Sequence, residues 1–226
     1  MSSNSQPLQT RLEAVQEEYR RRHLSDELDD IAETMEETIL QRVLAKAFFE
    51  ESVQIDAEAR ERVETVMTHL DRGDYGTVEA EIDDLETDVE SAATTVENRI
   101  QELRLKHNST VAAMRRLNDR VDRVSEVRLE ALEGLLDDWR WKEHVYLSGD
   151  ASLDELEANA REYGEEMRTA FDDLKDEMFG VYPEEIRNLI YRMIEDERLS
   201  YADLSETQRR QLAESDIGEY IELTLS

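Results

Sequence analysis

The sequence predicts an all-α protein: a long antiparallel coiled coil or helical hairpin, with small helical bundles at its N- and C-terminal ends. Glycine (7) and proline (2) are scarce among the 226 residues, whereas the turns of a β-rich fold need both. No glycine or proline occurs between Gly76 and Gly134, and apolar residues there recur at alternating steps of three and four. The apolar share of 39%, with 6% aromatic residues, is low for a globular core and ordinary for coiled coils.

The stretch 77–146 is predicted to form one continuous helix. Its apolar stripe repeats about every 3.5 residues, which keeps one narrow face toward a partner helix. The alternation is interrupted once, because the step of four that ends at Val96 is followed by another step of four to Ile100. This irregularity acts as a stutter that relaxes the supercoil. The stripe turns polar at 106–110, and a break there would instead leave two shorter helices folded into a bundle. The spacing leaves both alternatives open.

Before this stretch, residues 1–7 are expected to be a disordered lead-in and 8–72 an N-terminal helical region. A first helix carries Leu8, Leu12, Val15 and Tyr19 and is expected to end at the cations of 20–23. Ser25 is expected to cap a second helix, whose wide apolar face suits burial on two sides. A third helix, 56–70, should end at the turn formed by 71–76.

The long helix and a returning helix form the expected region 77–180. After a loop at 148–151, Ser152 and Glu155 form a capping box that opens the returning helix, and Gly180 suits its end. Residues 181–226 are expected to form a small helical cap, with a second capping box at Ser205 and a short last helix near 216–219.

The charge is strongly acidic, with 57 Asp and Glu against 27 Lys and Arg, a net charge of −30. This composition resembles that of proteins from salt-accumulating halophilic archaea, where molar KCl shortens the Debye length to about 3 Å. It also weighs against nucleic acid or an anionic membrane as a partner of the whole chain. Within the long stretch, 77–98 is acidic and 99–128 mainly basic, which favours an antiparallel mate. The returning helix is the favoured mate for the C-terminal half. It is too short to cover the whole helix, and a second copy would cover the rest, so a homodimer is also expected.

The residues needed for common chemistries are missing. The chain has no cysteine, hence no disulfide, thiolate nucleophile or cysteine-held metal. None of the four histidines has a carboxylate three residues before it, as di-iron bundles require. The phosphate-binding glycine loops and the serine elbow are absent. We therefore expect no enzymatic activity, no cofactor and no metal. Without a signal peptide or a long apolar run, we expect a cytoplasmic chain with no membrane segment.

Two groups of residues are candidate contacts. Trp139, Trp141 and Tyr146 suit a partner interface, because such residues are common binding hot spots; alternatively, one tryptophan fills the core. A cluster of arginines suits nucleic acid or an acidic partner, although pairing with the chain's own acidic helices is the favoured interpretation: Arg115, Arg116, Arg120 and Arg123.

These observations favour a non-enzymatic coiled-coil scaffold or adaptor, which assembles with protein partners or with itself in a halophilic cytoplasm. The alternative is an accessory factor of a chromosome or DNA-transaction complex. It would contact DNA or a DNA-handling ATPase through 99–128.

Overall fold

The computed structural model describes residues 8–53, 57–132, 138–147, 151–194, 202, 204–215 and 217–218. These residues form eight helices and no strand, which confirms the all-α class. None of the helices in this part of the chain is long and apolar enough to cross a membrane. The chain divides into two compact units: unit 1 holds 1–42 and 52–99, and unit 2 holds 43–51 and 100–226.

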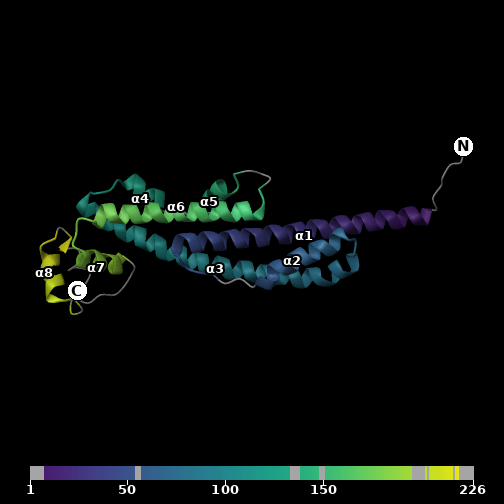
Figure 1. Ribbon diagram of the computed structural model, residues 1–226, viewed down its shortest axis with the longest axis horizontal. Coiled ribbons are helices and arrows are strands. Elements are labelled where there is room, and N and C mark those ends of the chain that lie inside the picture. Colours follow the sequence, from purple (N-terminus) through teal and green to yellow (C-terminus); the bar gives the residue numbers. More distant parts are fainter. Residues whose placement is uncertain are drawn as a thin grey trace. The chain divides into compact units, whose positions relative to one another are not determined.

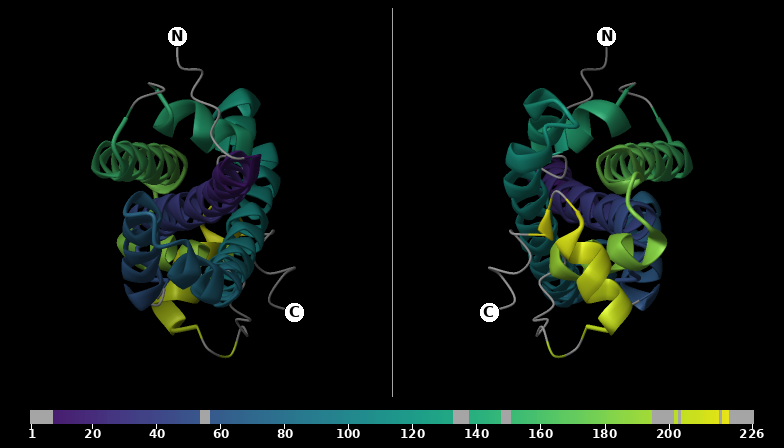
Figure 2. Two further views of the ribbon diagram at one scale, coloured as in Figure 1. Left: turned by 90° about the vertical axis from the view of Figure 1, so that its right-hand side faces the viewer. Right: turned by 90° about the vertical axis from the view of Figure 1, so that its left-hand side faces the viewer.

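Unit 1 consists of most of α1 (Leu8–Phe49), α2 (Ala57–Asp71) and the first half of α3 (Tyr75–Val121) (Figures 1 and 2). The turn expected at 71–76 is confirmed, with Gly73 at a φ of 76°. Ion pairs join Arg62 of α2 to Asp88 of α3 and Arg20 of α1 to Glu79 of α3. The core of the unit is built from apolar side chains of all three helices: Leu28, Ile31, Met35, Val63, Val66, Val78, Ile82, Leu85 and Val89.

Helix α1 is a single helix of 42 residues, so the helix end expected at 20–23 and the new start expected at Ser25 are wrong. The apolar stripe does change at this place. At 3.6 residues per turn, the stripe of Leu12, Val15 and Tyr19 lies roughly 150° around the helix from that of Leu24 and Leu28. In the sequence, this change of face resembles a change of helix.

The continuous helix expected over 77–146 is also wrong. Helix α3 passes through 106–110 without a break and ends at Val121, after 47 residues; α4 (Glu126–Leu132) and α5 (Asp138–Val145) follow it. The polar core positions at 106–110 are satisfied within the fold. His107 Nε2 lies 3.0 Å from the Leu132 carbonyl oxygen, and the Thr110 hydroxyl donates to the carbonyl of Lys106 at 3.0 Å. Polar residues in the stripe therefore did not require a helix end.

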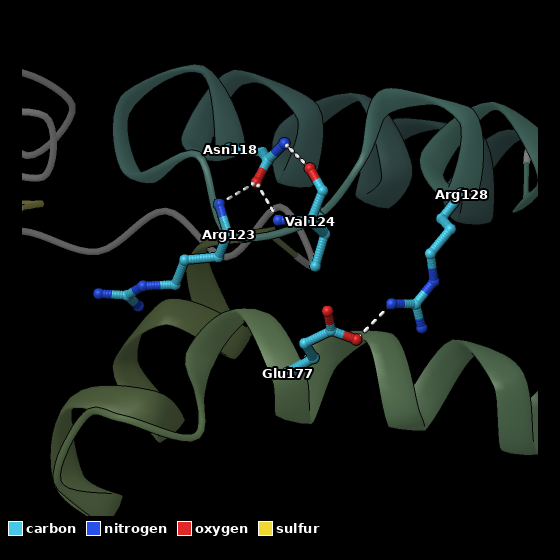
Figure 3. Close-up of polar contacts among 5 residues, drawn as sticks. All are labelled: Asn118, Arg123, Val124, Arg128 and Glu177. Atoms are coloured by element: carbon cyan, nitrogen blue, oxygen red, sulfur yellow. Dashed lines mark hydrogen bonds and ion pairs between the residues drawn. The ribbon is translucent and has the colours of Figure 1, made fainter.

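The side chain of Asn118 holds the turn that ends α3 (Figure 3). Its Oδ1 accepts hydrogen bonds from the backbone N–H groups of Arg123 and Val124, both at 3.1 Å. Its Nδ2 donates to the carbonyl of Val124 at 2.7 Å. Asp122, which lies between Asn118 and Arg123, has a φ of 46°, in the left-handed region that reverses the chain. An asparagine amide thus takes the place of the glycine or proline that usually marks such a turn.

Unit 2 contains α4, α5, α6 (Leu153–Phe179), α7 (Glu184–Ile194) and α8 (Glu206–Ala213), with the ends of α1 and α3. The capping boxes of α6 and α8 are confirmed. Helices α5 and α6 contact each other, and the His144 and Tyr163 rings are stacked at 4.6 Å. Residues 148–150, 216 and 219 of the expected loop and last helix lie outside the described residues. The fully buried side chains of the unit include Leu129, Trp141, Leu174, Met178, Phe179, Ile186, Leu189 and Ile190.

Two helices of unit 2 approach closely at Gly164 of α6, which packs on the last turns of α1. A Cβ atom at this position would lie 2.6 Å from Cβ of Ala47 and 3.1 Å from the carbonyl oxygen of Leu44. A distance of 2.6 Å is far inside van der Waals contact, so only glycine fits here without a shift of one helix. A glycine within a helix costs conformational entropy, and the close packing offsets that cost.

Candidate functional site

The N-terminal part of α1 carries an apolar stripe that the described residues leave uncovered. Every residue from 10 to 22, which we call the arm, is exposed. Within it Leu12, Val15 and Tyr19 are 59%, 65% and 73% exposed, and their spacing of three and four places them on one face.

The arm is uncovered because α2 and α3, the other helices of unit 1, end beside Arg20. Helix α3 begins at Tyr75, and the guanidinium of Arg20 lies 5.9 Å from the centre of the Tyr75 ring. The same guanidinium pairs with Glu79 one turn further along α3, which raises the pKa of Arg20 and lowers that of Glu79. Helix α2 ends just before α3 begins, and α1 extends past both of them in Figure 1. The covering helices therefore stop near the C-terminal end of the arm, beside Arg20.

The arm stripe is not a continuation of the core of unit 1. Leu24 and Leu28, which are 4% and 1% exposed, face the core from nearly the opposite side of α1. The flanks of the arm stripe carry Arg11 on the first turn and Glu18 two turns later. Glu18 accepts from Arg22 at 2.9 Å within the same helix. The arm thus presents a helix face suited to packing against another helix.

A second candidate lies in unit 2, where a hollow of about 260 Å³ opens beside His107. The imidazole is 6% exposed, and its ring centre lies 5.1 Å from that of Phe48 and 5.0 Å from that of Phe171. Burial lowers the pKa of His107, and the Leu132 carbonyl accepts a hydrogen bond from Nε2 in the neutral tautomer. Burial therefore favours the neutral form of the ring.

Two ion pairs lie beside this hollow. Lys175 Nζ lies 3.0 Å from a carboxylate oxygen of Asp172 and 4.9 Å from the centre of the Phe171 ring. Arg168 pairs with Glu50 at 2.6 Å, and Glu50 closes α1 in the left-handed region with a φ of 60°. This network ties the end of α1 to α6. The chemistry of the hollow is that of an aromatic packing cluster with a neutral imidazole inside it.

The predicted arginine cluster is engaged at two of its four positions within unit 2. Arg115 pairs with Glu126 of α4. Arg123 donates to the Met178 carbonyl at 2.8 Å, and its guanidinium lies 4.5 Å from the centre of the Tyr182 ring. Arg116 is exposed, and the side chain of Arg120 lies outside what the structure describes. A neighbouring cation, Arg128, pairs with Glu177 of α6 (Figure 3).

The predicted aromatic anchors are divided between core and surface. Trp141 is 1% exposed and belongs to the core of unit 2, with its ring centre 6.1 Å from that of Tyr146. Tyr146 is 36% exposed, and the side chain of Trp139 lies outside the described residues. Leu12, Val15 and Tyr19 were predicted to share a helix face but were not among the predicted site residues. The signal in the sequence that marks them is the change of stripe between Tyr19 and Leu24.

The exposed arm stripe and the aromatic cluster around His107 are thus two candidate features among the described residues. Among those residues, no three His, Cys, Asp or Glu side chains gather in a way that could hold a metal ion. Comparisons of the chain with protein-family models, with curated proteins and with solved structures find no match.

Proposed function

We propose that this chain is a non-enzymatic scaffold or adaptor, which joins a larger assembly by packing the arm of α1 against a helix of another polypeptide chain. The observation that carries the proposal is the stripe of Leu12, Val15 and Tyr19, three large apolar side chains more than half exposed on one helix face. An exposed apolar stripe of this kind is the usual mark of a helix-docking surface.

The arm suits docking because its helix is already formed. A separate peptide of that length would be marginally helical in water and would lose conformational entropy on binding. Here α1 continues into the core of unit 1, where Leu28, Ile31 and Met35 hold it in place. The stripe is therefore presented in a fixed conformation, and the cost of ordering it falls on folding and not on association.

The acidic composition fits a cytoplasm rich in salt. At a net charge of −30, copies and acidic partners repel one another in dilute buffer. In molar KCl that repulsion is screened within about 3 Å, while apolar contacts persist. Docking through Leu12, Val15 and Tyr19 is thus the type of contact that such conditions favour.

The DNA-transaction alternative has less support. It relies on the basic residues of 99–128 being available to phosphates. Within unit 2 Arg115 and Arg128 form ion pairs with Glu126 and Glu177, and Arg123 donates to a backbone carbonyl. These contacts favour a structural role for the cluster.

The test is the size of the assembly that contains the chain in extracts of the cells that produce it, prepared in molar KCl. A tagged wild-type chain should sediment well above its own 26.4 kDa, together with at least one other protein identified by mass spectrometry. Replacing Leu12, Val15 and Tyr19 by glutamine should return it to a smaller size. A chain that carries no other protein, or whose complex is unchanged by these substitutions, would refute the proposal.

The matched control replaces three apolar residues of similar exposure elsewhere, Leu105, Val127 and Val181, which are 62%, 72% and 67% exposed. It removes as many exposed apolar side chains but leaves the arm intact. The complex should keep its wild-type size in this control.

A further inference from the structure

We propose that the arm pairs with the arm of a second copy of this chain in an antiparallel orientation, forming a homodimer through residues 10–22. This inference rests on the proposed function, and it identifies the helix that packs against the stripe as the arm of a second copy. Three observations support it: the spacing of the stripe, the charges beside it, and the place along α1 where α2 and α3 end.

Two residues of the stripe, Leu12 and Val15, exchange places under an antiparallel two-fold axis. In heptad terms Leu12 and Tyr19 occupy position a, and Val15 occupies position d. When two such helices run antiparallel, each a residue faces a d residue of the other copy. Leu12 of each copy then faces Val15 of the other, and the two-fold axis repeats this pair. A large side chain meets a smaller one at both places, so one surface complements itself.

The charges flanking the stripe select the antiparallel orientation. Arg11 and Glu18 both occupy position g, on the same edge of the stripe. Antiparallel helices bring g against g, so Arg11 of each copy faces Glu18 of the other and two ion pairs form. Parallel helices bring g against e, where Gln16 and His23 stand, and no Arg–Glu pair forms. Opposite charges on one edge therefore distinguish the two orientations.

The position of the arm beyond the ends of α2 and α3 favours the same orientation. The elements that cover α1 in that unit end at Arg20, beside Tyr75, so a second helix can approach 10–19 without meeting them. Antiparallel arms place the two bundles of α1, α2 and α3 at opposite ends of the shared segment. Parallel arms would place them side by side, and each chain carries a net charge of −30.

The interface is small, with three apolar positions per arm, so we expect a dissociation constant in roughly the micromolar range. The test is sedimentation equilibrium of the purified full chain over a wide concentration range in molar KCl. The wild type should shift from 26.4 kDa to twice that mass as its concentration rises. Replacing Leu12 and Val15 by glutamine should weaken dimerisation at least tenfold. The control Leu105→Gln with Val181→Gln should not weaken it.

A charge exchange tests the orientation. It is measured at the lowest salt that preserves the wild-type circular dichroism, because molar salt screens ion pairs. Arg11→Glu should weaken the dimer several-fold, and adding Glu18→Arg should restore it. In a parallel dimer the double exchange would restore nothing.

A second test of orientation uses the absence of cysteine from the natural chain. A chain with Leu12→Cys is mixed with one bearing Val15→Cys and oxidised. Antiparallel arms predict disulfides mainly between the two different chains. Disulfides mainly between identical chains would overturn the inference.

The inference and the proposed function can fail separately. If the purified chain stays at 26.4 kDa at every concentration while its complex in extracts depends on the arm, the second copy is excluded and the scaffold role stands. If the arm forms the dimer but no other protein accompanies it in extracts, the dimer stands and the scaffold role fails. A dimer indifferent to Leu12 and Val15 would refute the inference directly.

Discussion

Replacing Gly164 by alanine should destabilise unit 2, although alanine is the better helix former. The new Cβ would lie 2.6 Å from Cβ of Ala47, a rigid neighbour, and 3.1 Å from the carbonyl oxygen of Leu44. Overpacking of this kind costs about 1–3 kcal/mol, and the severity of this contact places it toward the upper end. Greater helix propensity returns up to about 1 kcal/mol. We therefore expect a net loss of about 1–2 kcal/mol in the free energy of unfolding.

The assay is urea unfolding in molar KCl, followed by tryptophan fluorescence. Both tryptophans lie in unit 2, so the signal reports on the unit that contains Gly164. Adding Ala47→Gly removes the nearest atom and should recover part of the loss, which a double-mutant cycle measures as coupling between the two sites.

Gly76 provides the matched control, because a Cβ there would meet nothing within 4 Å. Gly76→Ala, followed by circular dichroism, should leave stability unchanged or raise it by up to about 1 kcal/mol. If Gly164→Ala proves as stable as the wild type, or if Ala47→Gly shows no coupling to it, the close approach of α6 to α1 is refuted.

Three further predictions concern His107, Asn118 and Ser152. Burial lowers the pKa of His107 below its ordinary 6.5, so the unfolded chain holds the proton more tightly and stability falls as the pH drops below that value. In His107→Gln, the urea midpoint should therefore change less between about pH 7.5 and pH 5.5 than in the wild type. Asn118→Ala removes three hydrogen bonds to the turn after α3 and should cost about 1–3 kcal/mol by urea unfolding. Ser152→Ala removes the cap of α6 and should cost about 1 kcal/mol by the same assay.

Each of these has an outcome that would contradict it. An unchanged pH dependence in His107→Gln would mean that the imidazole is not held neutral by burial. Full stability of Asn118→Ala would mean that the turn after α3 holds without the amide. Exposed Ser91, in the interior of α3, supplies the control for the cap, since Ser91→Ala should not destabilise the fold.

Local signals in the sequence predicted much of the fold because they act over a few residues. The turn between α2 and α3 and the capping boxes at Ser152 and Ser205 depend on side chains that satisfy nearby backbone groups. The returning helix was predicted to end near Gly180, and α6 ends at Phe179 with Gly180 as its cap. Such features depend little on the rest of the chain.

The end of the long helix could not be predicted from its apolar spacing. Val121 and Val124 continue the stripe of α3 in the sequence, yet the helix stops between them. The cause is Asn118, whose amide binds backbone groups five and six residues later. An asparagine within a helical pattern has many other uses, so its role follows only from the folded turn. His107, conversely, resembled a weak point, and the aromatic cluster around it keeps the helix intact.

The candidate site could not be predicted from the sequence for a related reason. Spacing identified Leu12, Val15 and Tyr19 as one face of a helix, but spacing does not say whether that face is covered. Coverage depends on where α2 and α3 end beside α1, which is a property of the tertiary fold.

The change of face along α1 makes the arm sensitive to insertions. Between Tyr19 and Leu24 the helix is uninterrupted, so it transmits rotation rigidly. One inserted residue would swing the stripe by about 100° and turn its receiving side toward a new direction. Four inserted residues would leave it within about 40° of its original direction and move it about 6 Å further out. The number of residues between Tyr19 and Leu24 thus determines the angle, about the axis of α1, between the arm stripe and the face that packs in the core of unit 1. Natural variants that keep the same pairing should accept changes of length there only in steps close to whole helical turns.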